Sequence, residues 1–262
     1  MGANTLRVWF DIDSHTRDRE SFLQVFGEIV ELIRVRDMKM MPVLYNCWVD
    51  DNYPFGALYP QDMYDGHKLR HYAYLEDVVG AFSQEKTIVM WDLCNEPFSV
   101  AWTPRCREKE TSFWLDLIAC FRKINPAQPL TMGTHSTVEQ TPEEIYEALD
   151  VLSCHLYTGW ENDTFLDTVL PHVTHANQMG KALVCTETFQ GSLSDENRSL
   201  CIERCKAAFK AVNIGYLAFQ LMEGKMISAR RDRTDLNCMP GDRGFFPFVL
   251  KNGTVRKGHS IL

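Results

Sequence analysis

The chain has 262 residues, of which 45% are hydrophobic and 24% are charged, values typical of a globular protein with a sizeable core. Its formal net charge is −8 and no cluster of Lys and Arg carries interleaved aromatic residues, which argues against nucleic acid and anionic membranes as partners. No apolar run reaches the length of a membrane span, and the first residues lack the layout of a signal peptide.

Apolar runs alternate with helical patterns along the chain. In chain order, the predicted strands are residues 3–10, 38–48, 87–94, 129–135, 149–157, 181–188 and 214–222. Amphipathic helices are predicted at residues 20–37, 112–124 and 198–212, and in the first of them the expected buried face is Phe22, Val25, Phe26, Ile29 and Ile33. Strands that alternate with helices predict parallel pairing with both faces covered. No repeat or linker divides the sequence, so we predict one α/β domain over residues 1–262.

Polar and aromatic residues gather where the predicted strands end. They are Arg7, Trp9, Asn46, Trp48, Asn95, Glu96, His135, His155, Tyr157, Glu187, Gln220 and Glu223. The first strand lacks the Gly-rich phosphate turn of a doubly wound sheet. Any one of them alone is better explained as an ordinary strand end than as a catalyst. Together, chemical residues at successive strand C-termini are typical of the catalytic face of a (β/α)₈ TIM barrel.

Two glutamates stand out among these residues. Glu96 ends the third predicted strand and Glu187 ends the sixth, and strands three apart in an eight-stranded barrel lie nearly across its mouth. Two carboxylates on either side of a sugar bond perform glycoside hydrolysis, with about 5–5.5 Å between them for retention and about 6.5–9.5 Å for inversion. Two unrelated glutamates would fit the same spacing, so the pattern alone leaves both interpretations open.

The motifs around these glutamates resemble those of a known family. "WDLCNEP" and the later "CTET" are similar to clan A glycoside hydrolases, in particular family 5 and its cellulase-like relatives. "GANTLRVW" resembles their second barrel strand and "SCHLY" their sixth, while "RGFFPFVLKNGTVRKGH" resembles the tail of bacterial cellulase-like or 1,4-β-xylanase-like members. The resemblance covers nearly the whole chain. It implies a retaining β-glycosidase that cleaves a β-1,4-linked glycan by double displacement.

The resemblance also implies a role for each catalytic residue. Glu96 would be the general acid/base, and Glu187 would be the nucleophile, kept ionised by donors such as Arg7 and the Tyr157 hydroxyl. Asn95 would donate a hydrogen bond to the sugar 2-hydroxyl.

Other residues are implied to bind the substrate around this pair. His155 would form a hydrogen bond near the acid/base or the leaving group. The remaining candidates are Trp9, Trp48, His135 and Phe219, with Trp102 and Trp160 as further stacking surfaces. For each tryptophan, packing in the core or at the surface is an equally good explanation.

Two features depart from the family pattern. Family members have a strand before the "GANTLRVW" element, and this chain has none, so we expect an N-terminally truncated barrel with seven recognisable strands and unpaired edges. Phe219 stands in the last strand, where the family usually has Trp. Phenylalanine keeps an aromatic platform but lacks the indole donor.

Two other functions stay open at this stage. A non-catalytic carbohydrate-binding barrel would keep the fold without turnover. A metal-dependent hydrolase would use His135, His155 and an acid, but the early His-x-His of such barrels is missing. We predict no cofactor or metal, and an oligosaccharide or polysaccharide as the partner. The nine cysteines contain no C-x-x-C, so we expect reduced thiols and a reducing, cytoplasmic compartment.

Overall fold

The computed structural model describes residues 2–47, 58, 63, 68–99, 104–224 and 244–259. The chain forms two compact units, which are treated separately below. The N-unit comprises Asn4–Asp50 and Pro54–Ser153, and the C-unit consists mainly of Cys154–Leu262. The single domain expected from the sequence stays a prediction.

The N-unit contains a parallel sheet whose strands pair in chain order. These strands are β1 (Thr5–Trp9), β2 (Lys39–Asn46), β3 (Trp91–Asn95) and β4 (Leu130–Gly133). All five residues of β3 are buried, as expected for a parallel sheet that is covered on both faces. The split between the units falls inside β5 (Val151–Leu156), and the Thr131 hydroxyl donates to the Val151 carbonyl at 2.7 Å.

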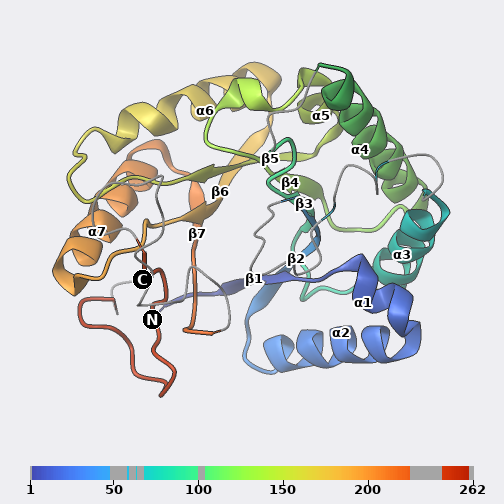
Figure 1. Cartoon of the computed structure of the whole chain (residues 1–262), viewed down its shortest axis with the longest axis horizontal. Coiled ribbons are helices and arrows are strands. Elements are labelled where there is room, and N and C mark those ends of the chain that lie inside the picture. Colours follow the sequence, from blue (N-terminus) through green and yellow to red (C-terminus); the bar gives the residue numbers. More distant parts are fainter. Residues whose placement is uncertain are drawn as a thin grey trace. The chain divides into compact units, whose positions relative to one another are not determined.

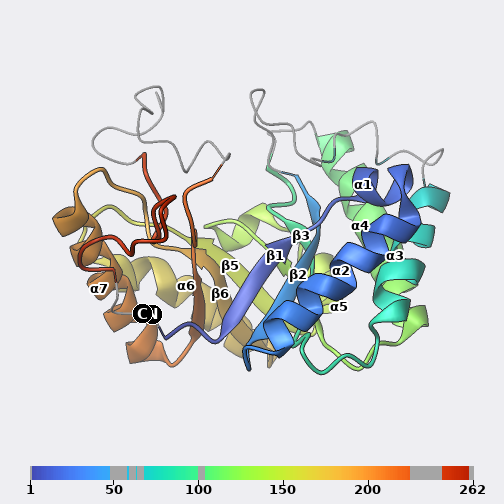
Figure 2. The same ribbon diagram turned by 90° about the horizontal axis from the view of Figure 1, so that it is seen from below.

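Helices connect these strands and cover the sheet. They are α1 (Ile12–Arg17), α2 (Arg19–Arg34), α3 (Lys68–Ala81), α4 (Pro104–Ile124) and α5 (Glu143–Ala148), with a 3₁₀ turn, η3, at Val138–Gln140. Helices α2, α3 and α4 lie along one side of the sheet (Figure 1). A view turned by 90° shows α2 beside β1 and β2 (Figure 2).

Helix α2 corrects one prediction about its buried face. The Asp18 carboxylate caps its first turn by accepting from the Ser21 amide at 3.0 Å. Phe26, Val30 and Ile33 are buried, whereas Val25 is 51% exposed. Neighbouring helical residues are about 100° apart around the axis, so the face centred on Phe26 turns Val25 toward solvent and includes Val30 instead.

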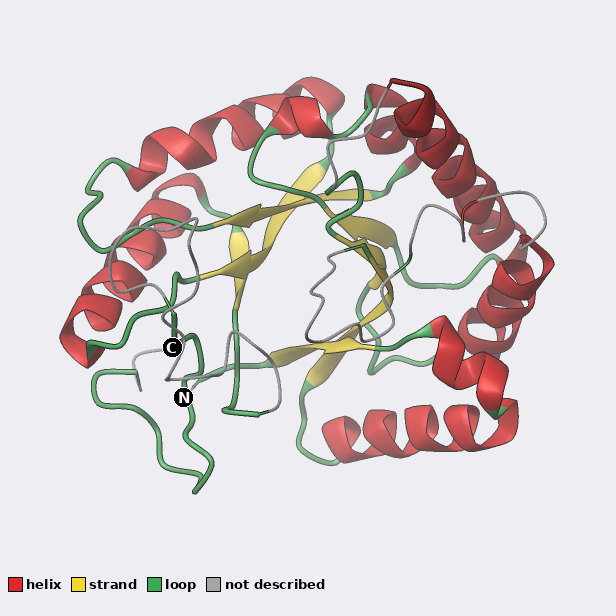
Figure 3. Cartoon of the chain, in the orientation of Figure 1, coloured by secondary structure: helices red, strands yellow, loops and turns green. Residues whose placement is uncertain are grey.

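The C-unit contains a second parallel sheet, ordered β5, β6 (Ala182–Thr188) and β7 (Gly215–Ala218). Helices α6 (Phe165–Met179) and α7 (Asp195–Val212) lie on the same side of it (Figure 3). Helix α7 begins after Ser194, whose hydroxyl accepts from the Asn197 amide at 3.2 Å. The core between the sheet and these helices includes four cysteines, Cys154, Cys185, Cys201 and Cys205.

Each of the seven predicted strands overlaps an observed strand, so this part of the sequence analysis is confirmed. The third strand is shorter than expected, because Ile88 forms only an isolated bridge to Met40 and regular pairing begins at Trp91. No disulfide joins any of the eight cysteines in the described part of the chain. None of the described helices is long and apolar enough to cross a membrane.

Candidate active site

In the N-unit, Glu96 stands on a turn directly after β3. Its backbone adopts φ 49°, in the left-handed region that non-glycine residues seldom occupy, and Phe98 follows with φ 60°. The Glu96 amide donates to the Gly133 carbonyl at 2.8 Å, and the Glu96 carbonyl accepts from the Ser99 hydroxyl. Ser99 also bonds His135 Nε2 at 3.0 Å. Backbone contacts therefore fix where the Glu96 side chain starts.

A buried glutamate on α4, Glu110, stabilises this turn by accepting hydrogen bonds. Glu110 is 4% exposed, and its Oε1 accepts from the Phe98 amide at 2.8 Å and from Trp114 Nε1 at 3.2 Å. Burial raises the pKa of Glu110 above its ordinary value. The carboxyl satisfies an amide that the sharp turn would otherwise leave without a partner.

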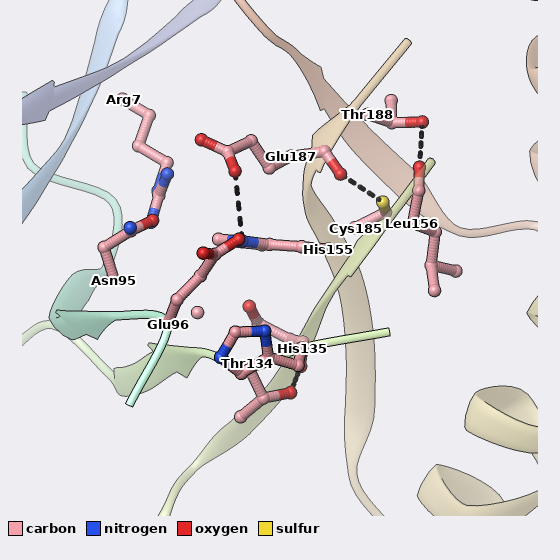
Figure 4. A network of polar contacts seen from close by, with 12 residues as sticks. Arg7, Asn95, Glu96, Thr134, His135, His155, Leu156, Cys185, Glu187 and Thr188 are labelled. Carbon is pink, nitrogen blue, oxygen red and sulfur yellow. Dashed lines mark hydrogen bonds and ion pairs between the residues drawn. The ribbon is translucent and has the colours of Figure 1, made fainter. Parts of the chain in front are cut away.

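The amide of Asn95 has a fixed orientation. Arg7 Nη2 donates to Asn95 Oδ1 at 2.9 Å, and the two side chains face each other in Figure 4. Asn95 Nδ2 donates to Asn46 Oδ1 at 2.9 Å. Because an arginine has no acceptor, its contact identifies the Asn95 atom that faces it as the oxygen. The Nδ2 group has two hydrogens, so one is left after the bond to Asn46 to donate to a ligand.

Arg7 itself is held by a buried ion pair. Its Nη2 lies 2.8 Å from Asp92 Oδ2, with side chains that are 6% and 0% exposed. Asp92 Oδ1 accepts from the Gly133 amide at 2.9 Å. On its other side, the Arg7 guanidinium lies 5.5 Å from the centre of the Trp9 ring, in cation–π range. With Asn46 on β2, four adjacent strands thus contribute to one polar network around Asn95.

In the C-unit, Glu187 stands inside β6 and pairs with His155 of β5. The distance from His155 Nδ1 to Glu187 Oε2 is 3.1 Å, and the side chains are 2% and 7% exposed (Figure 4). An ionised carboxylate is only an acceptor, so His155 carries a proton on Nδ1 when Glu187 is charged. His155 therefore contacts the residue that the resemblance implies as the nucleophile. Its predicted place near the acid/base or the leaving group stays a prediction.

The ends of β5, β6 and β7 lie level with one another around this pair. The Thr188 hydroxyl donates to the Leu156 carbonyl at 2.7 Å, and the Phe219 amide donates to the Thr188 carbonyl at 3.0 Å. Tyr157 and Phe219 come directly after β5 and β7, and both are partly buried. The strand ends therefore bring Tyr157 and Phe219 to the edge of the sheet that carries Glu187.

Other predicted contacts have different outcomes. Trp48 and Trp102 lie outside the described residues. Trp160 lies in the C-unit beyond β5 and is 40% exposed. His135 is partly buried beside Ser99 in the N-unit, where its Nε2 bonds the Ser99 hydroxyl at 3.0 Å. The absence of a metal stays a prediction.

The sequence analysis assigned no role to three residues that position this site: Asn46, Asp92 and Glu110. A signal existed for Asp92, because an aspartate inside an otherwise apolar strand needs a buried partner. Asn46 was noted as a strand end only. Glu110 lies on a helix, and nothing in its local pattern connects it with the Glu96 turn.

Residues 1–222 match the model of the family described as cellulase (glycosyl hydrolase family 5). Among solved structures, the exo-β-1,4-mannosidase Op5Man5 from Opitutaceae bacterium strain TAV5 is similar at 16% identity and TM-score 0.77, over 98% of this chain and 51% of that chain. The β-glucuronidase of Bifidobacterium dentium is similar at 14% identity and TM-score 0.67, over 98% and 39%. The β-glucuronidase of Sus scrofa is 24% identical over 115 residues, 44% of this chain and 16% of its own length.

These solved structures indicate the fold alone, an α/β TIM barrel of which seven strands lie in the described residues. The chain spans about half the length of the mannosidase and less of the glucuronidases. The fold class expected from the strand pattern is confirmed.

Proposed function

From the premise that the chain belongs to the cellulase family, glycosyl hydrolase family 5, we propose that it is a retaining β-glycoside hydrolase with Glu96 and Glu187 as its catalytic pair. The observation that carries this proposal is the Asn95–Glu96 dipeptide at the end of β3, with the Asn95 amide oriented by Arg7 and Asn46. An oriented amide next to a carboxyl is what recognition of a sugar hydroxyl beside the bond to be cleaved requires.

The first chemical step forms a covalent intermediate. The Glu187 carboxylate attacks the anomeric carbon while the Glu96 carboxyl gives its proton to the glycosidic oxygen, and the bond from that carbon to the leaving group breaks. His155 orients the Glu187 carboxylate through the contact of 3.1 Å. The leaving group departs as a neutral alcohol, and Glu96 is left ionised.

The second step releases the sugar. Water attacks the anomeric carbon of the glycosyl-enzyme, Glu96 takes a proton from this water, and Glu187 leaves as a carboxylate. Two displacements at one carbon return the original configuration. The mechanism requires about 5–5.5 Å between the two carboxyl groups, and this separation stays a prediction.

The substrate class is a β-linked neutral hexoside or β-1,4-glycan. The mannosidase and the glucuronidases to which this chain is similar suggest aryl β-mannosides and β-glucuronides as test substrates. Aryl β-glucosides and oligosaccharides derived from cellulose and mannan complete the panel. Activity that survives a chelator would separate this proposal from a metal-dependent hydrolase. Binding without turnover would identify a non-catalytic carbohydrate-binding barrel.

The leaving group distinguishes the two glutamates. Glu187→Ala is expected to lose activity on every glycoside, on the order of 10⁵-fold, because no nucleophile remains. Glu96→Ala is expected to lose about 10²–10⁴-fold on unactivated glycosides but to form the intermediate readily from a dinitrophenyl glycoside, which leaves without a proton.

Azide provides the matching control. In Glu96→Ala, azide should restore turnover and give the β-glycosyl azide, which NMR identifies. Full activity of Glu96→Ala on unactivated oligosaccharides would refute the assignment of Glu96 as the acid. An inverted product from the wild-type chain would refute double displacement.

A further inference from the structure

The segment after β7 brings another aromatic side chain to the edge of the C-unit sheet. Phe246 lies beyond residue 222, where the match to the family ends, so the family assigns it no role. The centre of its ring is 5.8 Å from that of Tyr157, with the ring planes 88° apart. Toward Phe219 the corresponding values are 5.5 Å and 68°. Phe246 therefore contacts two residues that the resemblance implies at the site, Tyr157 as a donor to Glu187 and Phe219 as an aromatic platform.

The backbone beside this ring is firmly anchored. The Phe245 carbonyl accepts from the Ser192 amide at 3.0 Å, from Arg198 Nη1 at 3.0 Å and from Arg256 Nη1 at 3.1 Å. Arg198 also donates from Nη2 to the Phe219 carbonyl at 3.1 Å. One buried guanidinium thus connects the backbone on both sides of the Phe219–Phe246 contact.

A glycine in the loop after β6 makes room for the ring. A Cβ atom at Gly191 would lie 2.6 Å from Cδ2 and 2.8 Å from Cε2 of Phe246. It would also lie 3.0 Å from the carbonyl carbon of Phe245, which is backbone and cannot rotate away. The loop that follows Glu187 is therefore shaped around this ring, which is independent evidence that its position is built into the fold.

The faces of the three rings are apolar. Tyr157, Phe219 and Phe246 are each partly buried, so part of each ring remains accessible, whereas Arg198 is 0% exposed. The C–H faces of neutral sugars pack well against aromatic rings. The carboxylate of a uronic acid would lose its water against these ring faces, and among the three side chains the Tyr157 hydroxyl alone could donate a hydrogen bond to it.

We propose that Phe246 is a specificity-determining residue, which with Tyr157 and Phe219 forms an aromatic corner that packs against a neutral hexoside bound at Glu187. This inference rests on the proposed hydrolase function. It adds a contact from outside the family region and names the class of sugar that the site accepts.

The test compares Michaelis constants for the 4-nitrophenyl β-mannoside, β-glucoside and β-glucuronide. Phe246→Ala should raise KM on the neutral glycosides roughly tenfold, the size of one aromatic contact, with kcat changed less. Phe246→Tyr should retain the wild-type KM because it keeps the aromatic ring. Gly191→Ala should reproduce the defect by displacing the ring. Leu193→Ala, in the same loop but 53% exposed, is the matched control and should behave as wild type.

Phe246→Leu keeps an apolar side chain if the alanine variant does not fold, and should still raise KM. A KM within about twofold of wild type in folded Phe246→Ala or Phe246→Leu would overturn the inference, as would a preference for the glucuronide. Glu187→Ala distinguishes a failure of the inference about Phe246 from a failure of the proposed hydrolase function. If Glu187→Ala loses activity while the Phe246 variants behave as wild type, the role of Phe246 is refuted and the proposed hydrolase function stands. If Glu187→Ala retains activity, or if the wild type turns over none of the three glycosides, the result counts against both the hydrolase function and the role of Phe246.

Discussion

The two proposed catalytic carboxylates are held in opposite ways. Glu96 follows its strand on a turn with φ 49°, and backbone hydrogen bonds determine its position. Glu187 stands inside a regular strand, and its side chain is held by His155 at 3.1 Å in surroundings that leave the carboxylate 7% exposed. A backbone-held acid depends on the residues that shape its turn and sheet. A side-chain-held nucleophile depends on its side-chain contacts, of which His155 supplies one, so the two halves should fail differently on mutation.

The largest effect should come from the ion pair in the N-unit. Arg7→Met would leave Asp92, whose side chain is 0% exposed, with the Gly133 amide at 2.9 Å and without the guanidinium. Removing one partner of a buried pair costs about 3–5 kcal/mol, so the free energy of unfolding measured with urea should fall by that amount. Arg122→Met is the matched control, because it breaks the exposed Arg122–Asp150 pair and should cost under about 1 kcal/mol.

Equal losses in the two arginine variants would show that the polar network around Asn95 does not support the N-unit. Activity gives a second measurement, because Arg7→Met also removes one of the two hydrogen bonds that orient the Asn95 amide. Under mild conditions, in which both variants remain folded, we expect Arg7→Met to bind glycosides more weakly than Arg122→Met does.

The next effect tests the side-chain-held half. His155→Ala removes a contact that positions Glu187 and should lower kcat about 100-fold, as expected when a positioning contact to a reacting group is lost. His155→Gln retains a donor and should recover part of this loss. His175→Ala, on α6, is the matched control. If His155→Ala changes KM alone, His155 binds substrate and does not position the nucleophile.

A pH-dependent effect of intermediate size belongs to the C-unit tail. Burial, with help from the charges of Arg198 and Arg256, lowers the pKa of His259 to about 4 from 6.5. Between these values the unfolded chain binds a proton that the folded chain excludes, so stability is complete above about pH 6.5 and falls as the pH drops toward 4. The loss between pH 7 and pH 5 should be about 2 kcal/mol. His259→Leu should flatten this part of the urea-derived stability profile, and an unchanged slope would contradict the assignment.

The smallest effect concerns the support of the Glu96 turn. Both hydrogen bonds to Glu110 reach the same oxygen, Oε1, so Glu110→Gln keeps an acceptor for the Phe98 amide and Trp114 Nε1. Burial raises the pKa of Glu110, so the free energy of unfolding falls as the pH rises from the ordinary carboxyl pKa toward the raised one, and the lowered stability persists above it. Glu110→Gln should therefore be neutral or stabilising by under about 1 kcal/mol at pH 7. Glu110→Ala should destabilise the chain and lower kcat, and equal behaviour of the two variants would refute this role.

The strands and the proposed catalytic pair could be predicted because their signals are local. Apolar runs such as residues 87–94 mark strands by composition, and "NEP" follows one of them directly. Val25 was misplaced because a helical face can be shifted by one residue without changing its apolar content. Glu110 and Phe246 could not be found, since each acts across a distance in the chain that no local period encodes. The contact between His155 and Glu187 likewise depends on the pairing of β5 with β6.

The three hydrogen bonds to the Phe245 carbonyl bear on where the folded domain ends. The family match stops at residue 222, yet Arg198 on α7 and Arg256 in the tail both donate to that carbonyl, and Phe248 belongs to the C-unit core. A recombinant chain cut at residue 222 would keep the Arg198 guanidinium but lose this acceptor and the ring of Phe248, which lies 4.7 Å from it. The region defined by shared sequence is therefore shorter than the unit defined by packing. Expression plasmids that end at residue 222 should yield insoluble or protease-sensitive protein.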